Sequence, residues 1–277
     1  RRSPVPFRRM PAPGRLSPDY RLRVMNPDVI LPQMTPQTAP ESTMSLPARI
    51  AGVLMEPGKA FADIAARPTG WWLPMVLVIV TSLVFVNLYS QRVGWERMMR
   101  HELETSSRTQ QMSAEQREAA LTQMVKFTGI VSYVGPLVGT PLSFLAMAGV
   151  LMLMMNSVMG GQSSYKQSLS VVSYSMLPSV ISGILAIVVM FIKSPDEFDI
   201  RNPLAFNAGA LVGSEAPKWL TALATSFDLF TFWMIGLMAI GFAATSRKMT
   251  VGKALTGIVT LWALVIVCKV GWTAMFS

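Results

Sequence analysis

The sequence has one cysteine and one histidine among its 277 residues, and each shortage excludes a class of site. Because Cys268 has no second cysteine to pair with, the chain forms no intrachain disulfide. His101 stands beside Glu102 and Glu104 in a polar stretch, which is more typical of a solvated helix than of a metal site. Nucleophile motifs, glycine-rich phosphate loops and internal repeats are also missing. We therefore expect a protein that is not an enzyme and that needs no metal or cofactor.

Charged side chains are scarce, and their absence is concentrated in long runs. They make up 14% of the chain, against about 25% in ordinary soluble domains. Runs with no charge, or with Asp228 alone, cover residues 68–91, 127–165, 167–192, 219–246 and 254–268. A helix needs about 20 apolar residues to cross a bilayer, and a soluble domain rarely offers several such runs. The sequence therefore predicts an all-α, polytopic integral membrane protein.

The formal net charge of +9 does not indicate nucleic acid as a partner. Ten of the 24 Lys and Arg residues precede the first apolar run, where a positive flank at an anionic membrane surface is the simpler explanation. We expect membrane lipids as partners, together with an unidentified membrane or cytoplasmic protein, and no nucleic acid.

Residues 1–44 predict a disordered, basic, proline-rich arm, because no periodicity lasts long enough to bury a face. The chain begins with Arg1 and not with Met. The arm is therefore expected to belong to a fragment or to extend the reading frame beyond the native start. Met25, Met34 and Met44 are the candidate start residues.

The segment 45–70 has the pattern of two short amphipathic helices. Apolar residues recur at helical spacing over 46–54, and Arg49 and Glu56 lie off that apolar face. Pro57 suits the first turn of a second helix. Each helix is expected to bury one face and to leave the other exposed.

A tryptophan pair, Trp71 and Trp72, follows these helices and begins the first apolar run. Tryptophan is enriched where a membrane meets water. We therefore expect residues 45–70 to lie as interfacial helices in the headgroup region, with the two tryptophans as anchors. The alternative is a small soluble helical hairpin.

Residues 71–277 predict a bundle of five transmembrane helices in the cell membrane. The expected spans cover about residues 72–90, 136–159, 168–191, 223–245 and 253–275. In the polar loop 91–126, Ser113 and Gln116 fit the capping box of a helix through Lys126. Five spans place the termini on opposite sides, and the basic turn at 247–253 favours a cytoplasmic N-terminus.

The apolar run 127–159 is too long for one span and too short for two. As a helix it measures about 50 Å, against a hydrocarbon core of ~30 Å. Pro136 and Pro141 are expected to break it, so that its first part either kinks across the membrane or lies at the interface. Gly135 and Gly139 have GxxxG spacing and are candidate helix-packing residues.

Two charges lie within the predicted spans, Asp228 and Lys269. Both are nearly the same number of residues from Met249, the expected turn of a helical hairpin, so their depths differ by about 1.5 Å. We predict an intramembrane ion pair, direct or through a water. The alternative is that Asp228 lies among the headgroups and Lys269 extends outward to the membrane surface.

Several short stretches share their order and spacing with one membrane protein family. They are Pro57–Pro68 with Trp71, Trp72 and Pro74; Gly161–Val171 with Tyr174–Pro178; and Asp228–Trp233 with Ala239–Phe242. Over residues 46–275 the chain resembles the bacterial branch of the Yip (Ypt-interacting protein) domain family. This resemblance implies five spans, a cytoplasmic N-terminus and a non-enzymatic membrane protein.

The eukaryotic members of the Yip family bind small Rab/Ypt GTPases in vesicle traffic. That role is not carried over, because the chain lacks the Asp-Leu-Tyr-Gly-Pro stretch of those members. We expect a protein that organises the membrane or binds protein or lipid partners. The alternative is a small transporter or channel subunit that uses Asp228 inside the membrane.

Overall fold

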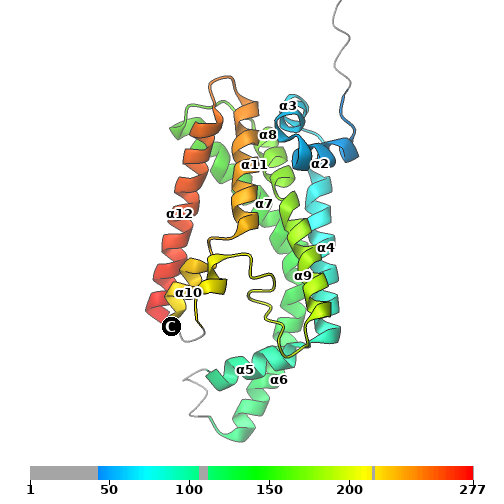
Figure 1. Ribbon diagram of the computed structural model, residues 1–277, viewed down its shortest axis with the longest axis vertical. Helices are drawn as coiled ribbons and strands as arrows, with labels where there is room; N and C mark the ends of the chain where they lie inside the picture. Colours follow the sequence, from blue (N-terminus) through cyan, green and yellow to red (C-terminus); the bar gives the residue numbers. More distant parts are fainter. Residues whose placement is uncertain (1–42, 106–111, 214–215, 277) are drawn as a thin grey trace, which may run out of the picture. The chain divides into compact units, whose positions relative to one another are not determined.

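The computed structural model describes residues 43–105, 112–213 and 216–276, and within these ranges it contains helices and loops but no β-strand. Most of the predicted arm at 1–44 lies outside the described residues. The helices are α2 (Leu46–Met55), α3 (Pro57–Ala66), α4 (Trp72–Arg92), α5 (Trp95–Thr105), α6 (Ala114–Val134), α7 (Thr140–Leu153), α8 (Tyr165–Ser175), α9 (Leu177–Ile192), α10 (Lys218–Ala224), α11 (Leu229–Thr245) and α12 (Val251–Phe276) (Figure 1). The prediction of an all-α protein is confirmed.

Among the described residues, four helical segments are long and apolar enough to cross a membrane. They are Trp72–Arg92, Ala114–Val158, Tyr165–Ile192 and Val251–Met275. Helix α11 is also apolar but is shorter, with 17 residues. The chain is therefore an all-helical membrane protein in which these four segments are the candidate spans.

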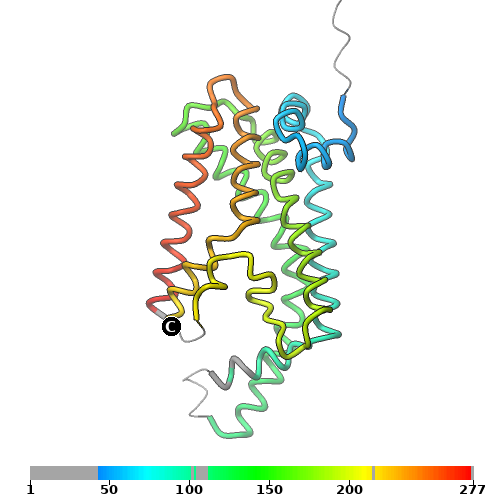
Figure 2. Tube along the Cα trace, in the orientation of Figure 1, coloured from blue at the N-terminus to red at the C-terminus, as the bar shows by residue number. Residues whose placement is uncertain are grey.

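The second of these segments does not break at its prolines. It is helical for 45 residues, from Ala114 to Val158, and Figure 2 shows α6 passing into α7 without a loop between them. Pro136 lies in the π-helical turn Gly135–Gly139. The altered hydrogen-bond spacing of such a turn accommodates a residue that has no backbone N–H to donate. The expected break is therefore wrong, and the helix of about 68 Å is far longer than a ~30 Å hydrocarbon core.

The predicted polar loop at 91–126 is largely helical. Ser113 and Gln116 form the expected capping box, with both reciprocal hydrogen bonds present, and α6 begins directly after it. Helix α5 folds back on α6 through Met99, Leu103 and Leu121. Since α6 continues into α7, this hairpin is a direct extension of a membrane helix.

Helix α11 begins later than the predicted span 223–245. The short helix α10 ends at Ala224, and Asp228 caps α11, accepting a hydrogen bond from the backbone amide of Thr231 at 3.0 Å. The predicted span included residues 223–227 because they are uncharged, so no sign of the break between α10 and α11 is visible in the sequence.

Helices α2 and α3 lie at one end of α4, and the α5–α6 hairpin lies at the other (Figure 1). Phe61 and Ile64 of α3 are fully buried in a core shared with α8 and α11, where they join Val171, Tyr174 and Phe242. The apolar face that the sequence predicted for α3 is therefore packed on the helical bundle.

Candidate functional site

The end of the bundle that carries α2 and α3 contains a buried charged network. Arg49 is only 3% exposed, and its Nε donates to Asp63 Oδ2 at 2.7 Å. Its Nη1 donates to the carbonyl oxygen of Thr69 at 2.8 Å, and Arg67 pairs with the second carboxylate oxygen of Asp63. The expectation that Arg49 lies off the buried face is wrong. A charge-assisted network joining α2, α3 and the connection to α4 compensates for its burial.

The two predicted anchor tryptophans have different environments. Trp71 packs against the core that α3 shares with α8 and α11. Trp72 is 49% exposed and belongs to the first turn of α4. Trp72 is therefore the more exposed of the two, and anchoring by either residue remains a prediction.

The GxxxG pair does not pack against another helix of the chain. A Cβ atom added at Gly135 or Gly139 would meet no atom within 4 Å. The close approach occurs instead at Gly241 of α11, where an added Cβ would lie 2.5 Å from Val171 Cγ1 and 3.0 Å from Phe61 Cδ1. Gly135 and Gly139 therefore make no close helix contact within the described chain, and their packing role remains a prediction. Their backbone belongs to the π-helical turn.

Asp228 and Lys269 form no salt bridge in the described part of the chain. Lys269 Nζ donates to Ser226 Oγ at 3.1 Å, while Asp228 Oδ1 accepts from the amide of Thr231. The direct form of the predicted ion pair is therefore absent, because each group has another partner. Ser226 and Asp228 are close in sequence, so a water-mediated contact remains a prediction.

The role of Asp228 as a helix cap leads to a simple expected result. Asp228→Ala should lower the free energy of unfolding by about 1 kcal/mol, and Asp228→Asn should change it little, because Asn caps a helix as well as Asp does. Denaturant titration of the detergent-purified chain measures both.

In proteoliposomes Asp228→Asn should leave solute and ion flux unchanged. If flux were lost together with the carboxylate, the transporter alternative would be supported.

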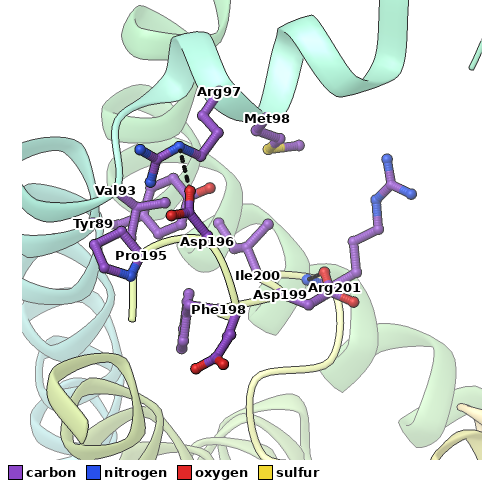
Figure 3. Close-up of a pocket in the computed structure, with 11 residues that line it drawn as sticks. Tyr89, Val93, Arg97, Met98, Pro195, Asp196, Phe198, Asp199, Ile200 and Arg201 are labelled. Atoms are coloured by element: carbon purple, nitrogen blue, oxygen red, sulfur yellow. Dashed lines mark hydrogen bonds and ion pairs between the residues drawn. The ribbon is translucent and has the colours of Figure 1, made fainter. Parts of the chain in front are cut away.

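A pocket of about 400 Å³, lined by both polar and apolar side chains, lies where α4 ends and α5 begins (Figure 3). We call it the α4–α5 pocket. Both charge signs line it, from Arg97, Asp196, Glu197, Asp199 and Arg201. Arg97 Nε lies 3.3 Å from Asp196 Oδ1, and both side chains are largely exposed. The pocket therefore offers both charge signs to a ligand without a deeply buried charge.

An aromatic cluster forms part of the wall of this pocket and packs beside it. Tyr89, which lines the pocket, is 2% exposed and lies with its ring centroid 4.7 Å from that of Trp95 and 6.1 Å from that of Phe198. Arg92 donates from Nε to the carbonyl oxygen of Met190 at 2.9 Å, which satisfies an otherwise unpaired carbonyl in the last turn of α9. The ends of α4 and α9 are thereby joined beside the pocket.

The sequence analysis did not find the α4–α5 pocket. Its two halves, 89–98 and 195–201, are about a hundred residues apart, and only the mixed charges of both loops signalled it. Among the described side chains, no group of three or more His, Cys, Asp or Glu is placed to hold a metal ion. The predicted surface cluster around His101 lies outside the described side chains. The arrangement suits binding of a segment that carries charged and apolar groups together.

Two comparisons with known proteins gave a match. A family model for the Yip1 domain matches residues 51–273. The chain is also similar to the membrane protein YknW of Bacillus subtilis (strain 168), with 29% identity over 194 residues, which cover 70% of this chain and 77% of that protein. No solved structure matches the chain.

Proposed function

The chain belongs to the Yip1 domain family of membrane proteins, and from this premise we propose that it is a non-enzymatic binding platform in the cell membrane. The α5–α6 hairpin and the α4–α5 pocket bind a segment of another membrane or membrane-attached protein. Helices α2 and α3 lie in the headgroup region at the opposite end of α4.

In this proposal α11 is a fifth span. Its 17 residues are at the lower end of the roughly 17–25 residues that cross a bilayer. Helix α11 packs beside α12, which has 26 residues, and a short turn joins them. With a cytoplasmic N-terminus, five spans place the α4–α5 pocket on the other side of the membrane.

The observation that carries the proposal is the position of the pocket. It lies where the end of α4 and the start of α5 meet the loop 195–201, and exposed charges of both signs surround it. Exposed charges at the rim of an interface add orientation and specificity more than affinity. The neighbouring buried aromatic cluster of Tyr89, Trp95 and Phe198 holds this rim in place.

Site-specific crosslinking tests the proposal in native membranes. A photoreactive p-benzoylphenylalanine replaces Glu197, an exposed pocket residue, and we expect one discrete protein adduct. The added substitution Arg97→Glu should reduce its yield about tenfold, the change that corresponds to about 1.4 kcal/mol, because it reverses a rim charge. The folded state should survive, since an exposed ion pair contributes only about 0–1 kcal/mol. Mass spectrometry identifies the adduct, and purified partner then repeats the comparison.

A probe at Val80 serves as the matched control, because this side chain is exposed on the apolar face of α4. The proposal requires that the Val80 probe does not give the same adduct. If the probes at both positions gave the same adduct in equal yield, the pocket would not be a partner site. The same would follow if Arg97→Glu left the adduct yield unchanged.

A further inference from the structure

An apolar groove of about 400 Å³ runs between α7, α11 and α12, away from the α4–α5 pocket. The three helices are labelled in Figure 1, where α11 and α12 stand side by side. The side chains that define the groove are Met147 and Val150 of α7, Met234 and Met238 of α11, and Trp262 and Val265 of α12. Such a volume is in the range of small-ligand sites, about 300–1,000 Å³.

The chemistry of the groove restricts what can fill it. Its lining is apolar except for Thr231, which lies in the first turn of α11. Flexible methionine side chains adapt their shape to an irregular apolar ligand. On α12 the groove covers the middle of a helix long enough to span a bilayer, so hydrocarbon chains surround it. An acyl chain matches both the lining and the surroundings.

A single positive charge lies beyond one end of the groove. Ile258, Trp262, Val265 and Lys269 recur at helical spacing, so Lys269 extends from the same face of α12, about 6 Å beyond Val265. Its ammonium is exposed and donates to Ser226 Oγ at 3.1 Å. In the described chain no carboxylate lies within salt-bridge distance of Lys269.

The side chains around Lys269 match the headgroup level of a membrane. Trp272 is exposed one turn beyond Lys269, close to the end of α12. Two turns deeper, at Trp262 of the groove, the ring centroid of Phe227 lies 5.5 Å from the indole in an edge-to-face arrangement. Aromatic rings and basic side chains together mark the level where acyl chains meet headgroups. The carboxylate of Asp228 is held by the N-terminus of α11.

We propose that this groove binds one phospholipid, with an acyl chain between α7, α11 and α12 and with its phosphate on Lys269 and Ser226. Anionic phospholipid is preferred over zwitterionic phospholipid, because Lys269 adds a positive charge that has no ion-pair partner among the described residues. The inference goes beyond the proposed partner platform and does not depend on it.

The test uses the full chain in vesicles of phosphatidylcholine and phosphatidylglycerol. A trace of phosphatidylglycerol with a photoreactive acyl chain is added, and mass spectrometry locates the adducts. We expect them at the methionines and Trp262 of the groove. Lys269→Gln should reduce the yield about fivefold, as expected for one basic residue at an anionic surface, while a phosphatidylcholine probe should be little affected. Ala146→Phe, which fills the groove from its exposed rim, should reduce the yield of both probes.

Two matched controls are available on α12. Lys253→Gln removes a basic residue at the other end of the helix, and Ala263→Phe adds the same bulk on an exposed position outside the groove. Neither should change the adducts. Labels spread evenly over the exposed helix faces, insensitivity to Ala146→Phe, displacement by inorganic phosphate, or crosslinks between two copies of the chain would each overturn the lipid site. Thermal unfolding of every variant confirms that it is folded.

Discussion

Asp63→Leu is expected to lower the free energy of unfolding by about 3–5 kcal/mol, because it leaves Arg49 buried without its counter-ion. Arg49 is almost completely buried, and the carboxylate of Asp63 is its only ion-pair partner among the described residues. The substitution also releases Arg67 from the same carboxylate. Denaturant titration of the detergent-purified chain, followed by tryptophan fluorescence, measures the change.

Two variants separate the loss of the buried pair from a general effect of mutating α3. The double variant Arg49→Met/Asp63→Leu removes both charges and should recover most of the lost stability. Glu56→Gln breaks the exposed ion pair with Lys59, where the hydrogen bond from Lys59 to Glu56 raises the pKa of the ammonium, and should change stability little because solvent screens the pair. A loss no larger than that of Glu56→Gln would contradict a structural role for the buried network.

Gly241→Ala is expected to destabilise the chain by about 1–3 kcal/mol, the usual effect of adding volume to a well-packed core. The new methyl group would lie 2.5 Å from Val171 Cγ1 and 3.0 Å from the Phe61 ring. Both neighbours are fully buried, so they have little room to move away. Because small residues let membrane helices approach closely, the contact among α3, α8 and α11 should loosen.

Gly236 provides the control for Gly241, because both glycines lie in α11. A Cβ atom at Gly236 would meet nothing within 4 Å. Gly236→Ala should therefore be neutral, or should stabilise the helix by up to about 1 kcal/mol through the higher helix propensity of alanine. The same titration compares the two variants, and equal effects would refute the packing argument.

Local sequence patterns predicted the helices well where the signal was close in sequence. Pro57 starts α3, and Ser113 with Gln116 starts α6, because a cap depends on neighbouring backbone groups. The Pro136 break was predicted wrongly, since a π-helical turn keeps the long helix continuous there. Asp228 was assigned to the interior of a span, whereas it caps α11.

The amino-acid sequence by itself determined that this protein is helical and membrane-embedded, because the length and lack of charge of its apolar runs are properties of single segments. The tertiary structure alone decided which groups meet. Arg49 is buried because Asp63 faces it, and Gly241 is a packing residue because Val171 and Phe61 lie against it. Lys269 lies near an apolar groove only because α7 and α11 pack beside α12. Such contacts join residues far apart in the chain, so no local pattern records them.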